Sequence, residues 1–262
     1  MFHYTKAVLR VGPRLFHACA FTFARWSKHL ERYPFPLRHA KFRRLSKKVA
    51  DALNVEFHVF GLENIPQDET FFLVANHMSA FDPLPFLINI DSPTTFVGKD
   101  ELTRVPLLKN AIKALDVRTI ERDNLRQSLK VMLEVEEDIK KKERNWMIFP
   151  EGTRIRDPLL PVADFHHGTF RPAWKTKTTI LPAAMYGTFR VLKLKPQFKK
   201  YPVYISFLKP ITAEQYAGLN TSDLAEMTHK MIQKEITYHL RPLDHKDMSE
   251  RKEKNYHPDM II

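Results

Sequence analysis

Short apolar segments alternate along this chain with longer amphipathic ones, and that alternation restricts the fold more than any other feature. Val55 to Phe60 alternates in polarity as a half-buried strand does, whereas Phe71 to Ala75 is apolar throughout, as in a strand buried on both faces. Further short strands are expected at residues 96–97, 117–120, 145–149, 179–184 and 203–207. Helical patterns lie at residues 106–115, 125–142 and 222–240. This order predicts βαβ units and therefore an α/β fold with a mostly parallel central sheet flanked by helices.

The charge of the chain is distributed unevenly, and this divides its 262 residues into three parts. The first 50 residues contain twelve Lys and Arg but a single acid, Glu31, and so account for nearly all of the formal net charge of +12. Residues 51–240 carry the predicted strands and are long enough for one large domain. The polar residues 241–262 are expected to form a loose C-terminal tail.

Large apolar side chains interleave with the basic ones in the N-terminal segment of residues 1–50. Phe21 and Trp26 lie beside Arg25 and Lys28, as in amphipathic helices that enter a membrane interface and contact anionic headgroups. A helical hairpin packed on the main domain, with its basic face in solvent, is an alternative. Nucleic-acid binding is disfavoured because no reading motif is present. No apolar run reaches the roughly 20 residues of a membrane span, so we expect a peripheral or monotopic protein on an anionic membrane surface.

An Asn-His pair and a lone carboxylate interrupt an apolar stretch, VANHMSAFDPLPF, at residues 74–86. His77 follows a predicted buried strand, and Asp82-Pro83 is typical of a helix start, with Asp at the N-cap and Pro at the first helical position. A turn of this kind can bring the carboxylate to one imidazole nitrogen, so that the other nitrogen can take a proton from a hydroxyl. The alternative is a capping Asp beside an ordinary loop histidine.

A second group of polar residues follows the predicted strand at 145–149, in the sequence FPEGTRIRD. Gly152 permits close approach of a ligand to the backbone, Thr153 adds a hydroxyl, and the guanidinium of Arg154 can bind phosphate oxygens in a bidentate manner. Arg122, at the end of another short strand, is a further candidate phosphate ligand. A salt-bridged surface turn that includes Glu151 is the alternative interpretation.

Taken together, these motifs resemble those of the glycerophospholipid acyltransferase family, in particular the bacterial 1-acylglycerol-3-phosphate acyltransferases. The resemblance runs from about residue 57 to residue 211 and makes residues 51–240 an acyltransferase domain. NHMSAFD is similar to the NHxxxxD block of the family, which implies that His77 is the general base and Asp82 its orienting partner. The FPEGTR block implies that Glu151, Gly152, Thr153 and Arg154 hold the substrate's glycerol phosphate. Further implied sites are an arginine that binds phosphate, Arg122, and a Pro-bearing strand near the acyl chain, residues 180–182.

The chain departs from the family pattern at two places. The segment 106–122 resembles a further block of the family, in which Lys109 and Asp116 stand where relatives usually have glycines. Aspartate tolerates the left-handed backbone better than most residues, so a helix end at Asp116 is still expected. Relatives typically have Phe-Lys-x-Gly after the FPEGTR block, whereas this chain has Phe-His-His-Gly at 165–168. His166 therefore replaces a permanent cation by one that titrates near neutral pH.

The expected reaction moves a fatty acyl group from an acyl thioester, acyl-CoA or acyl carrier protein, to lysophosphatidic acid, giving phosphatidic acid at the cytoplasmic face of the cell membrane. Glycerol 3-phosphate or another lysophospholipid is an alternative acceptor. A phosphate-ester hydrolase would need a metal cluster or a covalent nucleophile, and no G-x-S-x-G or H-E-x-x-H motif occurs. A non-enzymatic membrane or nucleic-acid binding protein would leave residues 74–154 unexplained. We expect no bound cofactor, no metal and no nucleic-acid partner.

Overall fold

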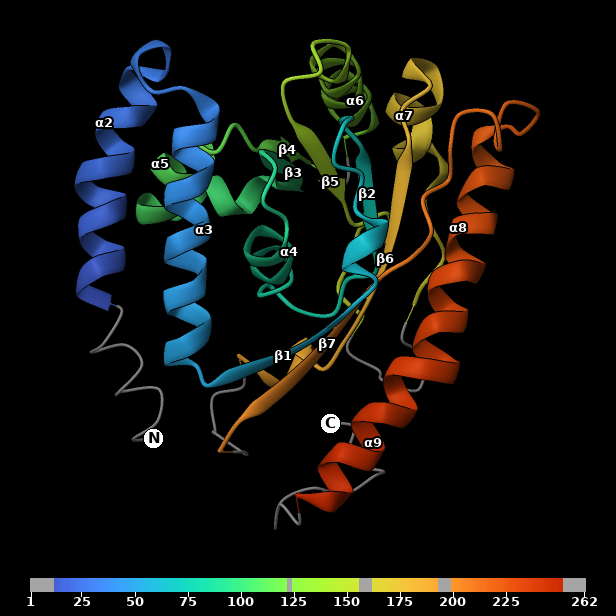
Figure 1. Ribbon diagram of the computed structural model, residues 1–262. Coiled ribbons are helices and arrows are strands. Elements are labelled where there is room, and N and C mark those ends of the chain that lie inside the picture. The colour runs from blue at the N-terminus through green and yellow to red at the C-terminus, as the bar shows by residue number, and fades with distance from the viewer. Residues whose placement is uncertain (1–11, 122–123, 156–161, 193–198, 252–262) are drawn as a thin grey trace.

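A computed structural model describes residues 12–121, 124–155, 162–192 and 199–251 of the chain (Figure 1). Its centre is a seven-stranded sheet of order β1-β7-β6-β2-β5-β3-β4, in which only the β6–β7 pair is antiparallel. The strands are β1 (Val55–Phe60), β2 (Phe72–Ala75), β3 (Thr94–Lys99), β4 (Arg118–Ile120), β5 (Asn145–Ile148), β6 (Ile180–Tyr186) and β7 (Tyr201–Phe207). The predicted α/β fold with a mostly parallel sheet is confirmed, and each predicted strand is present with ends that differ by a few residues.

Helices cover both faces of this sheet (Figure 1). They are α2 (Phe23–Lys28), α3 (Phe35–Ala52), α4 (Pro83–Asn89), α5 (Pro106–Ala114), α6 (Leu125–Lys140), α7 (Arg171–Thr176), α8 (Thr221–Glu235) and α9 (Arg241–Glu250). Successive side chains of a strand point to opposite faces. Accordingly Phe72 and Val74 of β2 belong to a core that also contains residues of α6 and α8, whereas Leu73 and Ala75 belong to a second core shared with α3 and α4. Burial on both faces explains why β2 is apolar throughout.

The parallel pairing of β2 with β5 places the candidate residues together. Val74 is paired with Ile148, so the two strands end at the same edge of the sheet. The chain then leaves β2 toward His77 and leaves β5 toward Glu151, which brings two loops distant in sequence side by side. The carboxyl edge of a parallel sheet is where α/β proteins commonly bind their ligands.

The N-terminal segment forms helices that pack on the sheet domain. Residues 12–17, the π-helical turn η1 (Ala18–Thr22) and α2 are followed, after a short connection, by α3, which lies beside α2 in Figure 1. The rings of Phe23 and Phe42 stack with 4.2 Å between their centroids, and Phe23 shares a small core with Ala111 and Ala114 of α5. This packing on the main domain agrees with the hairpin interpretation. Helix α3 continues to Ala52, two residues past the boundary predicted at residue 50. Among the described residues no helix has both the length and the apolar character needed to span a bilayer.

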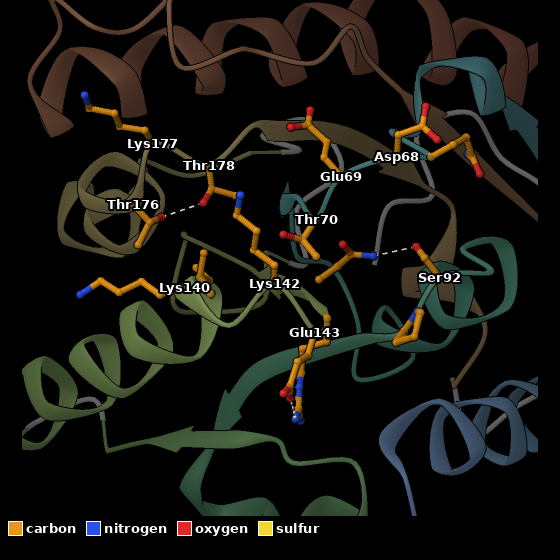
Figure 2. Close-up of a pocket in the computed structure, with 15 residues that line it drawn as sticks. Asp68, Glu69, Thr70, Ser92, Lys140, Lys142, Glu143, Thr176, Lys177 and Thr178 are labelled. Atoms are coloured by element: carbon orange, nitrogen blue, oxygen red, sulfur yellow. Dashed lines mark hydrogen bonds and ion pairs between the residues drawn. The ribbon is translucent and has the colours of Figure 1, made fainter.

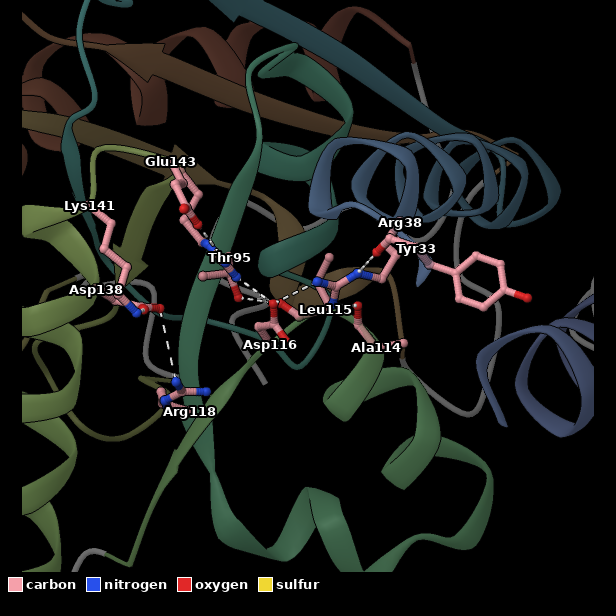
Figure 3. A network of polar contacts seen from close by, with 11 residues as sticks. Tyr33, Arg38, Thr95, Ala114, Leu115, Asp116, Arg118, Asp138, Lys141 and Glu143 are labelled. Carbon is pink, nitrogen blue, oxygen red and sulfur yellow. Dashed lines mark hydrogen bonds and ion pairs between the residues drawn. The ribbon is translucent and has the colours of Figure 1, made fainter. Parts of the chain in front are cut away.

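A buried ion network ties the N-terminal segment to the sheet domain (Figure 3). Arg38 of α3, which is 4% exposed, donates to Asp116 over 3.0 Å and to the Ala114 carbonyl at the end of α5 over 2.6 Å. Arg144, just before β5, donates to the same Asp116 oxygen over 2.5 Å. Asp116 has the left-handed φ of 52° that was expected where relatives carry glycine. One carboxylate thus joins three segments of the chain.

The prediction of a loose C-terminal tail at residues 241–262 was wrong for its first ten residues. Arg241–Glu250 form α9, which continues from α8 through the π-helical turn η7 (Ile236–Leu240). Asp244 and Met248 are 2% and 1% exposed, and Asp244 forms an ion pair with the buried Arg190. The segment is polar because it packs through ion pairs, which a hydrophobic pattern does not reveal. Residues 252–262 lie outside the described residues.

Candidate active site

His77 and Asp82 form a close pair just after β2. The Nδ1 atom of His77 lies 2.8 Å from Oδ2 of Asp82. The Asp82 side chain is fully buried, whereas the imidazole is 16% exposed. A carboxylate at Nδ1 fixes the tautomer in which Nδ1 carries the proton and Nε2 is the acceptor. Nε2 of His77 makes no hydrogen bond to any described residue, so it can receive a proton from a ligand.

Asp82 is the N-cap residue of α4, as predicted, but its carboxylate does not cap that helix. Oδ2 instead accepts the backbone N–H groups of Met78 and Ser79, over 2.6 and 2.8 Å, in addition to the imidazole. Ionised carboxylates are stabilised by such backbone donors. The residues between His77 and Asp82 are therefore held in a turn by hydrogen bonds to the Asp82 carboxylate. Helix α4 begins at Pro83, which has no N–H that requires an acceptor.

The imidazole of His77 is held from the side by an aromatic ring. It stacks on Phe149 with centroids 4.4 Å apart and an angle of 21° between the ring planes. Phe149 in turn packs against Phe86 of α4. Phe149 was not predicted to be part of the site, although its position directly before the PEGTR residues was a usable signal. The contact restricts rotation of the imidazole and keeps Nε2 in one direction.

Glu151 lies behind this site and is only 3% exposed. Its Oε1 accepts the backbone N–H of His77 over 2.6 Å, and its Oε2 accepts the N–H of Ala163 over 3.1 Å. Burial, with a smaller effect from the nearby Asp82, raises the pKa of Glu151 to about 8, against the effect of the two N–H bonds. Both oxygens are occupied by backbone donors, so the carboxylate is not placed to contact the substrate phosphate, the role that was expected for it.

The remaining residues of the FPEGTR block lie toward solvent. Gly152 has φ of 62°, and a Cβ there would be 3.1 Å from the ring of His166, so glycine allows the imidazole to lie against the loop. Thr153, Arg154 and His166 are exposed. Arg154 and His166 thus present two basic side chains from the loop after β5 and from the segment that follows it. Arg122 falls outside the described residues.

A cavity in the described part of the chain lies at the opposite edge of the sheet, where the parallel strands begin (Figure 2). Its volume is about 570 Å³, and it is lined by Glu69, Lys142, Asn145 and Thr178, among others. These residues precede or begin β2, β5 and β6, whereas His77 and Glu151 follow β2 and β5. The cavity is therefore separate from the His77 site. The described residues contain no cluster of three metal-ligating side chains.

The profile of the acyltransferase family matches residues 56–186, half of the chain. The chain belongs to the acyltransferase family. The match begins in β1, ends with β6, and includes the His77, Asp82 and Glu151 loops, so the site lies within the part that defines membership.

Individual relatives and a solved structure agree with this membership. A protein of Borreliella burgdorferi named 1-acyl-sn-glycerol-3-phosphate acyltransferase is 31% identical over 134 residues. The alignment covers 51% of the present chain and 52% of the Borreliella protein. The Escherichia coli protein of the same name is 28% identical over 62% of the chain and 65% of its own length. The chain thus spans between half and two thirds of these relatives. The crystal structure of the 1-acyl-sn-glycerophosphate acyltransferase PlsC from Thermotoga maritima has the same fold, with a TM-score of 0.67, 22% identity, and coverage of 90% and 92%.

Proposed function

We propose that this protein transfers a fatty acyl group from an acyl thioester to the free hydroxyl of 1-acylglycerol 3-phosphate. The observation that carries the proposal is the 2.8 Å contact between Nδ1 of His77 and the buried Asp82, which makes Nε2 the proton acceptor. Exposed basic side chains, Arg154 and His166, lie on the adjoining loop and can bind a phosphate. The names of the relatives support the same acceptor.

The geometry suits direct transfer with the substrate hydroxyl as nucleophile. Nε2 of His77 takes the hydroxyl proton while the oxygen attacks the thioester carbonyl carbon. The C–S bond of the resulting tetrahedral intermediate then breaks, the acyl ester remains on the glycerol, and the proton on Nε2 passes to the departing thiolate. Asp82 stabilises the imidazolium between these steps and keeps its own charge.

An acyltransfer assay tests the proposal directly. The full chain is incubated with labelled acyl-CoA, and separately with acyl carrier protein carrying the same acyl group, in the presence of 1-acylglycerol 3-phosphate. Phosphatidic acid is the expected product, and the more efficient thioester identifies the donor. Glycerol 3-phosphate and lysophosphatidylcholine, assayed in parallel, separate the alternative acceptors. Free fatty acid as the sole product with every acceptor would contradict the proposal.

We also propose that the N-terminal helices hold the enzyme on an anionic membrane surface. Phe16 and Phe21 are 55% and 61% exposed, and the basic Arg25 and Lys28 of α2 are exposed beside them. Such a mixture favours a membrane interface, and each cation near an anionic surface adds about 1 kcal/mol. On α3, Arg44, Lys47 and Lys48 are exposed as well. The membrane in question is expected to be the cytoplasmic face of the cell membrane.

Charge reversal on α3 is expected to weaken membrane binding. Replacing Arg44, Lys47 and Lys48 by Glu should lower cosedimentation with phosphatidylglycerol vesicles at least about tenfold, because six units of charge change next to an anionic surface. Reversal of three exposed lysines remote from this segment, Lys175, Lys209 and Lys230, is the matched control. Equal binding of the two triple variants would refute the assignment of the surface.

His166→Lys is expected to change how acceptor binding depends on pH. An imidazole carries positive charge only at low pH, whereas an ammonium keeps its charge throughout this range. For the wild type, the acceptor KM should therefore rise several-fold between pH 6.5 and 8, and for His166→Lys it should remain constant. His167→Lys, at the neighbouring exposed position, is the control. Superimposable KM profiles of wild type and His166→Lys would show that His166 does not contact the phosphate.

A further inference from the structure

We propose that Glu151 is a positioning residue that holds His77 in its catalytic place by clamping two backbone segments together. This inference rests on the proposed acyl transfer, and it replaces the contact with substrate phosphate that the family pattern implies for this residue. The clamp joins the loop after β2, the loop after β5 and the segment that leads to His166. Its function is to keep Nε2 of His77 at a constant distance from the basic side chains that receive the phosphate.

The clamp consists of hydrogen bonds from two different loops to one carboxylate. Oε1 of Glu151 accepts from the backbone N–H of His77 and Oε2 from that of Ala163. Two hydrogen bonds between backbone groups join the same segments. The Ile155 N–H donates to the His77 carbonyl over 2.8 Å, and the His166 N–H donates to the Pro150 carbonyl over 3.0 Å. The backbone of His77 is therefore held from both its N–H and its C=O by the loop after β5.

Only a carboxylate provides both acceptors. Glutamine has the same shape, but one of its two terminal groups is an NH2 donor. The backbone N–H of either His77 or Ala163 would then point at this donor and have no acceptor. Direct binding of the substrate phosphate by Glu151 is disfavoured by its burial and by the use of both oxygens. The residue can thus act on turnover only through the loops that it joins.

The protonation of Glu151 gives the clamp a recognisable pH signature. Because burial raises the pKa of Glu151 to about 8, the carboxyl is largely protonated at pH 6 and ionised at pH 9. The protonated acid, like glutamine, has one acceptor oxygen fewer. The groups that face the carboxyl are the backbone N–H groups of His77 and Ala163 and the carboxylate of Asp82. The kcat of the wild type should therefore approach that of Glu151→Gln at pH 6 and exceed it about tenfold at pH 9.

The decisive experiment is a double-mutant cycle between Glu151→Gln and His77→Ala at pH 8.5. Alone, Glu151→Gln should lower kcat about tenfold and change acceptor KM less than twofold. In the His77→Ala background it should have no further effect, because a residue that acts through His77 loses its influence once the imidazole is gone. Glu63→Gln, at an exposed carboxylate, is the matched control. An equal tenfold loss in both backgrounds, or a change confined to KM, would overturn the inference.

Hydrogen exchange followed by mass spectrometry tests the clamp without an assay of activity. Peptides that contain His77 and Ala163 should exchange at least about tenfold faster in Glu151→Gln than in the wild type, and peptides of β7 should not change. Unchanged exchange at both loops would refute the clamp even if acyl transfer is observed. Faster exchange in a protein without acyltransferase activity would instead retain the clamp and reject the proposed function. If Glu151→Gln fails to fold, Ala163→Pro removes one N–H and serves in both experiments.

Discussion

His77→Ala is expected to lower kcat at least about 100-fold while acceptor KM changes little. The imidazole supplies the proton acceptor for the attacking hydroxyl, and loss of a positioned general base typically reduces turnover by two to four orders of magnitude. Arg154 and His166 remain to bind the phosphate, so the loss should appear in kcat. Steady-state kinetics with acyl thioester and 1-acylglycerol 3-phosphate measure both parameters.

Asp82→Asn and His167→Ala are the two controls for this result. Asn can donate to Nδ1 and so favours the tautomer in which Nε2 carries the proton, which should lower kcat by a comparable factor. His167 is exposed next to the site, and its loss should leave kcat within about twofold. A His77→Ala enzyme that keeps most of its turnover would exclude the general-base mechanism.

Asp116→Ala is expected to destabilise the protein by about 3–5 kcal/mol. The substitution leaves the buried guanidinium of Arg38 and the partly buried one of Arg144 without their shared counter-ion, and breaking a buried ion pair from one side typically has an effect of this size. Thermal or urea unfolding measures the loss. Glu101→Ala, at the exposed pair with Lys99, should change stability by less than about 1 kcal/mol. A loss that small for Asp116→Ala would show that the network does not contribute to stability.

The same network predicts how stability depends on acidity. Burial would raise the pKa of Asp116, but hydrogen bonds from Arg38 and Arg144 outweigh it and hold the pKa below its usual range. The unfolded carboxyl has a pKa of about 3.9. The stabilisation is therefore complete above that value and is lost as the pH falls through the lower folded value. Asp116→Ala should lack this part of the acid sensitivity of the wild type.

The periodicity of apolar residues was sufficient to predict the α/β fold, because each buried strand and each helix face depends on local pattern. The pairing order of the strands was not predictable in this way, since β1 and β7 meet through contacts that no local pattern records. Helix α9 was missed for a related reason. Its buried Asp244 is satisfied by Arg190, and an ion pair between distant residues looks in sequence like two ordinary surface charges.

The candidate site was predictable where spacing determines geometry. His77 and Asp82 lie on one short turn, so their contact follows from five residues of sequence. Glu151 was placed at the correct loop but with the wrong surroundings, because its burial depends on Ala163 and on the His77 loop, neither of which is its neighbour in sequence. Phe149 was overlooked because an aromatic residue at the end of a strand usually belongs to the core.

The position of β1 at the edge of the sheet affects how the chain reaches its native state. Within the described ranges β1 pairs with β7 alone, and Val55 pairs with Tyr201, so most of the chain must be synthesised before this pair can form. Closing so long a loop carries an entropic penalty, and proteins rich in such distant contacts fold slowly. Until β7 emerges, β1 has an unpaired backbone edge and can associate with other strands. Translation that stops before residue 200 is therefore expected to yield chains that aggregate or require chaperones.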